Sequence, residues 1–114
     1  MKLAELAQRL NLRELTPECG DGEEVAGGYA SDLLSDVLVH APAGGVLITL
    51  QVHLNVIAVA SHAGLQAVIF SCDRVPEQDV IDRAAGENLS LYATASDTFE
   101  IAGRLYEMGL RGRT

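Results

Sequence analysis

The sequence contains few aromatic residues and few basic ones, and both shortages limit what the chain can be. Only 4% of its 114 residues are aromatic and none is Trp, so the core must be built from Leu, Val, Ile and Ala. Lys and Arg number 8 against 16 Asp and Glu, which gives a formal net charge of −8. Nucleic acids and anionic membrane surfaces bind proteins through positively charged patches. We therefore expect neither a nucleic-acid partner nor a membrane partner.

Cysteine and long apolar runs are also scarce. The two cysteines, Cys19 and Cys72, lie far apart and form no C-x-x-C or Cys/His pattern, so neither a disulfide framework nor a metal site is predicted. No apolar stretch reaches the length of a membrane span. The first residues, MKLAELAQRL, space their apolar side chains as an amphipathic helix does, whereas a signal peptide would have a continuous apolar run. We expect a cytoplasmic protein with no cofactor and no metal ion.

Apolar residues, by contrast, make up 48% of the chain, and their spacing predicts an α/β fold. Three apolar runs, VLITL, AVIF and LSLYA, are typical of strands that are covered on both faces. Helical spacing precedes and separates these runs, and the alternation predicts crossovers between parallel strands. We predict a single domain over residues 1–114, with a mostly parallel sheet, helices on both faces and a flexible tail from about residue 110 to 114.

Several residues are expected to start the predicted helices. Ser31 or Asp32 should cap a helix, and Asn55 should cap the apolar helix VIAVASHA. Asp97 and Glu100, three residues apart, predict a capping box at the last helix. The buried stripe of the helix after Asp32 is predicted to consist of Leu34, Val37, Leu38 and Ala41.

Polar side chains follow the predicted strands, at the edge where open α/β sheets bind ligands. The candidate ligand-binding residues are Gly28, Ser31, Asp32, Gln51, His53 and Asn55. Helix capping and tight bends are the simpler explanation for most of them. No phosphate-binding glycine loop of known type occurs, and Cys72, at the end of a buried strand, is expected to be an inert apolar thiol. We assign no catalytic residue.

The stretch VLITLQVHLNVIAVASH contains the strongest candidates. Gln51, His53 and Asn55 alternate along it, and an extended chain would place all three on one side. We predict that they form one polar cluster at the carboxyl end of the central strand, near the start of the helix that follows Ser31. Imidazole donates, accepts and titrates near neutral pH, so His53 suits ligand recognition, acid–base chemistry, a dimer contact or a purely structural hydrogen bond.

The segments VAGGYASDLLSDVL, ITLQVHLNVIAVAS and FEIAGRLYEMGL, in this order, resemble the DRTGG domain family and in particular its small stand-alone members. The resemblance implies a fold similar to the N-terminal domain of HPr kinase/phosphorylase and a regulatory, accessory role. It also implies an association with hydrogenase or energy-metabolism systems, and a larger enzyme or a histidine-kinase-like ATPase as partner. The eponymous Asp-Arg-Thr-Gly-Gly does not occur, and LQVHLN corresponds to the loop that carries the Asp-Arg pair in fused members.

Our preferred hypothesis is a non-catalytic regulatory or protein-interaction module that forms a homodimer. The apolar helix 56–63 and the last helix, with Phe99 and Tyr106, offer more apolar surface than a small sheet covers. Such a surplus is typical of an interface.

Two other hypotheses remain in competition with it. One is a sensor that binds a small anion or a nucleotide at the strand ends, although Asp32 and Asp73 would repel a phosphate. The other is a small hydrolase or transferase that uses His53 as its base, with a nucleophile brought near it only by the fold. No kinase is expected, because the ATP-binding P-loop is missing.

Overall fold

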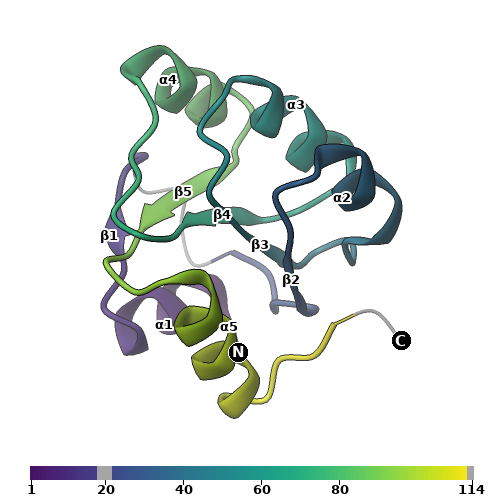
Figure 1. Cartoon of the computed structure of the whole chain (residues 1–114), viewed down its shortest axis with the longest axis vertical. Helices are drawn as coiled ribbons and strands as arrows, with labels where there is room; N and C mark the ends of the chain where they lie inside the picture. Colours follow the sequence, from purple (N-terminus) through teal and green to yellow (C-terminus); the bar gives the residue numbers. More distant parts are fainter. Residues whose placement is uncertain (18–21, 113–114) are drawn as a thin grey trace.

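The computed structural model describes residues 1–17 and 22–112 and has a five-stranded sheet at its centre (Figure 1). The strands are β1 (Arg13–Glu14), β2 (Gly28–Ala30), β3 (Val46–Thr49), β4 (Ala67–Phe70) and β5 (Ser90–Ala93). Their order is β1-β5-β4-β3-β2, with β2 to β5 parallel and β1 antiparallel to β5. The predicted α/β fold with a mostly parallel sheet is confirmed. Cys19 lies outside the described residues.

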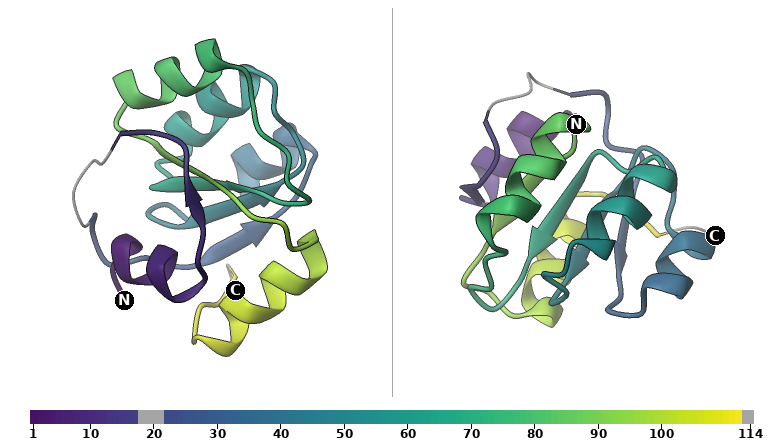
Figure 2. Two further views of the ribbon diagram at one scale, coloured as in Figure 1. Left: turned by 90° about the vertical axis from the view of Figure 1, so that its left-hand side faces the viewer. Right: turned by 90° about the horizontal axis from the view of Figure 1, so that it is seen from above.

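Helices cover both faces of the sheet, as predicted (Figure 2). The helices are α1 (Leu3–Arg9), α2 (Leu34–His40), α3 (Asn55–His62), α4 (Gln78–Gly86) and α5 (Thr98–Glu107). Since β2, β3, β4 and β5 add to the sheet in one direction, crossovers of one hand place α2, α3 and α4 on the same face. Helices α1 and α5 lie on the opposite face. None of the described helices is long and apolar enough to cross a membrane.

Alternation along the strands divides the core into two layers. The layer under α2, α3 and α4 contains the strand residues Leu47, Val68, Phe70 and Leu91. The layer under α1 and α5 contains the strand residues Val46, Ile48, Ala67, Ile69 and Tyr92. Both sets are buried, which explains why these strands are apolar without alternation.

Helix α3 owes its apolar sequence to its position between α2 and α4. Its residues Val56, Ile57 and Ala60 are fully buried against the sheet and the neighbouring helices. Its exposed residues include only small or polar ones such as Ala58 and Ser61. Most apolar side chains of this helix, which the sequence suggested as an interface, are therefore buried in the core of the domain.

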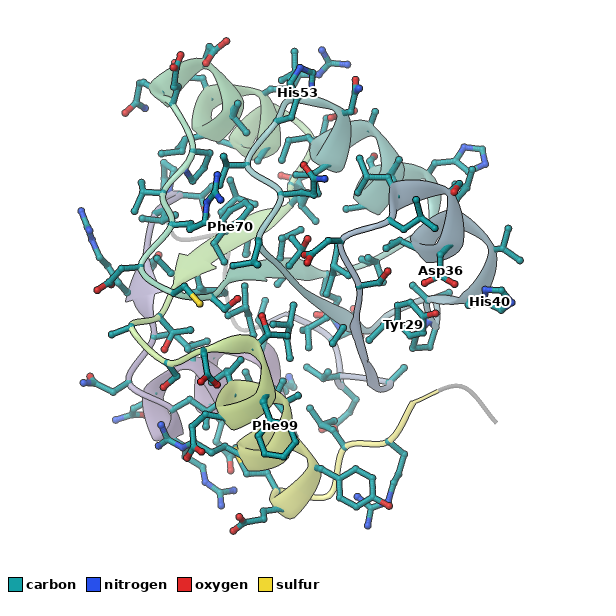
Figure 3. All side chains as sticks on the ribbon, in the orientation of Figure 1. Tyr29, Asp36, His40, His53, Phe70 and Phe99 are labelled. Carbon is teal, nitrogen blue, oxygen red and sulfur yellow. The ribbon has the colours of Figure 1, made fainter. Side chains whose placement is uncertain are left out.

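On α5, by contrast, two large aromatic side chains are exposed to solvent. Ile101 and Leu105 are buried against the sheet, whereas Phe99 is 88% exposed and Tyr106 is 59% exposed. Figure 3 shows Phe99 on the outer side of the helix. The capping box predicted for this helix is supported, because the Asp97 carboxylate accepts a hydrogen bond from the Glu100 N–H at 2.8 Å.

Two other predictions about helix starts are wrong. Helix α2 starts after Leu33 and helix α3 starts after Leu54, and neither has a side-chain cap. The short strand β1 was not predicted, because two residues give no readable alternation. In α2, Val37 is buried as predicted, but Leu38 is 44% exposed because α2 covers the edge of the sheet.

The end of the described chain runs back along the free edge of β2. The Gly28 N–H donates to the Arg111 carbonyl at 3.0 Å, and the Arg111 guanidinium lies 3.8 Å from the centre of the Tyr106 ring. Gly27 tolerates no side chain here, since a Cβ would come within 2.5 Å of the same carbonyl oxygen. The tail predicted to be flexible thus begins with residues that contact the sheet, and residues 113–114 lie outside the described part.

Candidate functional site

The loops that follow β2, β3, β4 and β5 meet at the carboxyl edge of the sheet. Parallel strands end together, so residues far apart in the sequence become neighbours there. Two pairs of loops have to be distinguished. The first pair follows β2 and β3, and the second pair follows β3 and β4.

In the first pair, hydrogen bonds tie the two loops together. The Asp32 carboxylate accepts from the Thr49 hydroxyl at 2.9 Å and from the Leu50 N–H at 2.7 Å. The Gln51 side-chain amide donates to the Asp32 carbonyl at 3.1 Å, and the Gln51 N–H donates to the Thr49 hydroxyl oxygen at 3.1 Å. Thr49 is fully buried, so this network satisfies a polar group that burial would otherwise leave unpaired. We name it the Asp32 network.

His53 makes a local hydrogen bond at the start of α3, but neither it nor Asn55 is a side-chain cap of that helix. The Asn55 N–H donates to the Nδ1 atom of His53 at 3.0 Å, next to the first turn of α3. Because Nδ1 accepts this bond, the proton of the neutral imidazole is on Nε2. His53 is exposed and lies at the outer end of the loop, so its Nε2–H can donate to another molecule (Figure 3).

The second pair of loops borders an open hollow of about 610 Å³. It is lined by Gln51, Val52, His53 and Leu54 from the β3–α3 loop, and by Arg74, Val75, Glu77, Asp79 and Val80 from the β4–α4 loop and the first turn of α4. We name it the carboxyl-edge hollow. Volumes of this size are typical of sites for small molecules.

The structure separates the predicted site residues. Gln51 and His53 line the carboxyl-edge hollow, and Gln51 also belongs, with Asp32, to the hydrogen-bond network beside it. Ser31 accepts a hydrogen bond from the Leu33 N–H at 3.2 Å, within its own loop. Gly28 begins β2 and so lies at the opposite end of that strand. A ligand-binding role for these residues stays a prediction.

Sequence reasoning missed the residues that the β4–α4 loop contributes to the hollow. Arg74 was the available signal, since it is a cation in the loop after a buried strand, and the chain has few cations and a net charge of −8. The loop is held by the Cys72 N–H, which donates to the Ser96 carbonyl at 2.9 Å, and by the Asp73 N–H, which donates to the Thr94 carbonyl at 2.8 Å.

Cys72 differs from the expectation of a buried, inert thiol, because it is exposed. The residue has a φ of +58°, and Asp73 follows with a φ of +57°. Two successive left-handed residues turn the chain sharply at the end of β4. The turn carries the Cys72 side chain out of the buried layer that ends at Ser71.

A third polar cluster joins β2 to α2, and sequence reasoning missed it as well (Figure 3). The Tyr29 hydroxyl donates to the Asp36 carboxylate at 2.7 Å, and the His40 Nδ1 lies 2.9 Å from the other carboxylate oxygen. The hydrogen bond from Tyr29, with support from Ser31 and His40, lowers the pKa of Asp36. The same bond raises the pKa of Tyr29. Neither Tyr29 nor Asp36 lines the carboxyl-edge hollow.

The hollow is chemically suited to binding rather than to nucleophilic catalysis. The side chains that line it include an imidazole, a guanidinium and two carboxylates, but no Ser, Thr or Cys. Among the described residues, no three His, Cys, Asp or Glu side chains lie close enough to hold a metal ion together. His53 therefore has no nucleophile among the lining residues to activate.

Comparison with known proteins supports the fold. No family model matches the sequence, and no curated protein matches it. The structure is similar to the crystal structure of the CBS and DRTGG domains of the regulatory region of a Clostridium perfringens pyrophosphatase, complexed with the activator diadenosine tetraphosphate. The TM-score is 0.73 at 16% sequence identity.

The alignment with this structure covers 96% of the present chain and 47% of the other one, so the chain spans about half of that length. At such a low identity the likeness concerns the fold alone. The chain thus has a fold related to that of this pyrophosphatase regulatory region, and membership of the DRTGG family stays a prediction.

Proposed function

We propose that the chain is a non-catalytic regulatory module that binds a small anionic ligand in the carboxyl-edge hollow. The observation that carries this proposal is the position of Arg74 and His53 on the lining of a hollow without a nucleophile. The Arg74 side chain is exposed and is in none of the ion pairs found in the described part of the chain. Its guanidinium is therefore available to a carboxylate or a phosphate.

The contrast with the Asp32 network supports this proposal. In that network Asp32, Thr49 and the Gln51 amide group already have partners within the chain. Hydrogen-bond donors without a partner among residues 1–17 and 22–112, such as the Arg74 guanidinium and the His53 Nε2–H, are available to bind a ligand. The proposal thus places the ligand beside the predicted cluster, on the side of the β4–α4 loop.

The comparison supports a regulatory role over a catalytic one. The similar fold belongs to the regulatory region of the C. perfringens pyrophosphatase, and that region was crystallised with an activator. We infer that the present chain also changes the activity of a partner when its ligand binds. The resemblance to stand-alone DRTGG domains suggests a larger enzyme, a hydrogenase system or a histidine-kinase-like ATPase as that partner, in the cytoplasm.

Thermal unfolding with a panel of small anions tests the ligand-binding part. A ligand at a hundred times its Kd stabilises the folded chain by about 2.7 kcal/mol, which should raise Tm by at least about 10 °C. Arg74→Ala should abolish the shift. Arg104→Ala removes an exposed arginine from the opposite face of the sheet and should leave the shift unchanged. No shift with any anion, or an equal shift in Arg74→Ala, would overturn the proposal.

We further propose that the module is a homodimer that associates through α5. Phe99 and Tyr106 are exposed one above the other on this helix, seven residues apart, and Gly103 between them leaves room for a partner side chain. Aromatic side chains exposed to this extent favour a protein interface. Light scattering should give twice the chain mass for the wild type and the monomer mass for Phe99→Glu. A monomeric wild type at micromolar concentration would contradict the dimer.

A further inference from the structure

The carboxyl-edge hollow carries charges of both signs, which restricts the ligands it can take. Arg74 and His53 offer hydrogen-bond donors, whereas Glu77 and Asp79 offer carboxylates, one oxygen of Asp79 already accepting from the Val80 N–H at 3.0 Å. A bare anion near Arg74 would be repelled by these carboxylates. A better ligand combines an anionic group with hydroxyl or amino donors that the carboxylates can accept.

The hollow also has an apolar lining from both loops. Leu54 is 38% exposed and Val75 is 41% exposed, and both line the hollow. Val52 is half-buried and Val80 is buried, and both also line the hollow. These four side chains offer a surface on which the face of a flat ring would lose contact with water.

From these two observations we infer that the ligand is a nucleoside phosphate, an inference that rests on the proposed function. The phosphate binds to the Arg74 guanidinium and the His53 Nε2–H. The base packs on Leu54 and Val75. The ribose hydroxyls or a base amino group donate to Glu77 or Asp79. Each kind of lining side chain thereby finds a matching part of one molecule.

Two simpler ligands agree less well with the same lining. Inorganic phosphate would use Arg74 but would leave the apolar side chains exposed and would face both carboxylates. A zwitterionic amino acid would satisfy both charges, but it would fill little of a hollow of about 610 Å³. Both belong in the test as competitors.

Calorimetric titration of the full chain with AMP and GMP tests the inference. We expect at least one of the two to bind at least about tenfold more tightly than ribose 5-phosphate, inorganic phosphate or leucine. Arg74→Ala should weaken nucleotide binding about ten- to a hundredfold, the usual value of a charged hydrogen bond, and should leave adenosine or guanosine binding unchanged.

A second variant separates the base from the phosphate. Val75→Ser should weaken nucleotide and nucleoside binding severalfold and leave ribose 5-phosphate binding unchanged, since it removes apolar contact alone. Val75 is exposed, so the variant should keep its fold, which circular dichroism would verify. Arg104→Ala should bind like the wild type.

The outcomes distinguish this inference from the proposed function. If inorganic phosphate or ribose 5-phosphate binds as tightly as the nucleotides and binding needs Arg74, the anion site stands and the nucleoside phosphate is wrong. If leucine binds most tightly, the inference is likewise wrong. If no ligand binds, or if Arg74→Ala binds all ligands like the wild type, both the inference and the proposed function are overturned.

Discussion

Two neighbouring pairs of loops at the carboxyl edge use their polar residues in opposite ways. Between β2 and β3, the Asp32 carboxylate, the Thr49 hydroxyl and the Gln51 amide bind one another. Between β3 and β4, Arg74 and His53 line an open hollow without binding each other. The difference shows that a polar side chain at a strand end is no evidence for a ligand site until its partners within the chain are known.

The largest expected effect is a loss of stability when the Asp32 network is broken. Asp32→Ala removes the acceptor of the buried Thr49 hydroxyl and of the Leu50 N–H, and should lower the free energy of unfolding by about 2–3 kcal/mol. Asp32→Asn keeps an acceptor oxygen and should lose less. Urea unfolding measures both. An Asp32→Ala variant as stable as the wild type would mean that the network does not stabilise the fold.

Arg74→Ala should show the reverse pattern. Its guanidinium has no ion pair within the described chain, so its removal should change the free energy of unfolding by less than about 0.5 kcal/mol. Anion affinity should fall about ten- to a hundredfold. Urea unfolding and calorimetric titration on the same preparation measure the two quantities. If Arg74→Ala lowers the free energy of unfolding and leaves anion affinity unchanged, Arg74 stabilises the fold as the Asp32 network does and is not a ligand-binding residue.

His53→Ala should lower both the folding stability and the ligand affinity, each to a smaller extent. The Asn55 N–H loses its acceptor, which should cost about 1 kcal/mol in the free energy of unfolding, the usual net contribution of one hydrogen bond. The ligand loses one donor, and its affinity should fall severalfold. His53→Asn retains a side-chain acceptor and should recover part of the stability. If His53→Ala unfolds the protein, the residue is a structural one and does not belong to the binding site.

The smallest expected effect concerns the pH dependence of the Tyr29–Asp36–His40 cluster. The pKa of Asp36 is lowered by its hydrogen bonds, so its stabilising effect is present above the ordinary carboxyl pKa and is lost as the pH falls through the lowered value. The pKa of Tyr29 is raised, so its effect is lost as the pH rises through the raised value.

Tyr29→Phe tests this pH dependence, because it removes the hydroxyl and keeps the ring. Unfolding of this variant, followed by fluorescence or circular dichroism, should vary less with pH at both extremes than unfolding of the wild type does. Ligand affinity should be unchanged, because Tyr29 lies outside the carboxyl-edge hollow. Equal pH profiles for the two proteins would contradict the role of the hydrogen bond.

Local patterns were sufficient to predict the type and order of most elements. The buried runs of β3, β4 and β5 contain enough apolar residues in succession to indicate strands, and the spacing of Leu3, Leu6 and Leu10 indicates α1. The Asp97 cap lies within one turn of the Glu100 N–H that it binds. All these features depend on residues within a few positions of each other.

The candidate site could be predicted only in part, because its groups come from separate loops. The spacing of Gln51, His53 and Asn55 predicted one polar cluster at the end of β3, and the structure places Gln51 and His53 on the lining of the hollow. The spacing could not show that the Asn55 N–H would donate a hydrogen bond to the His53 side chain. Which of these residues donates and which accepts depends on the backbone conformation of the turn between β3 and α3.

The remaining features were decided by strand order and register. Asp32 reaches Thr49 because β2 lies beside β3, and Arg74 borders the same hollow as His53 because β4 lies on the other side of β3. Cys72 is turned outward by bonds to the loop after β5. Periodicity in a sequence reports which side chains avoid water, but it carries no information on which distant polar atoms will meet. The sheet brings these atoms together, and only then are some of them paired and others left for a ligand.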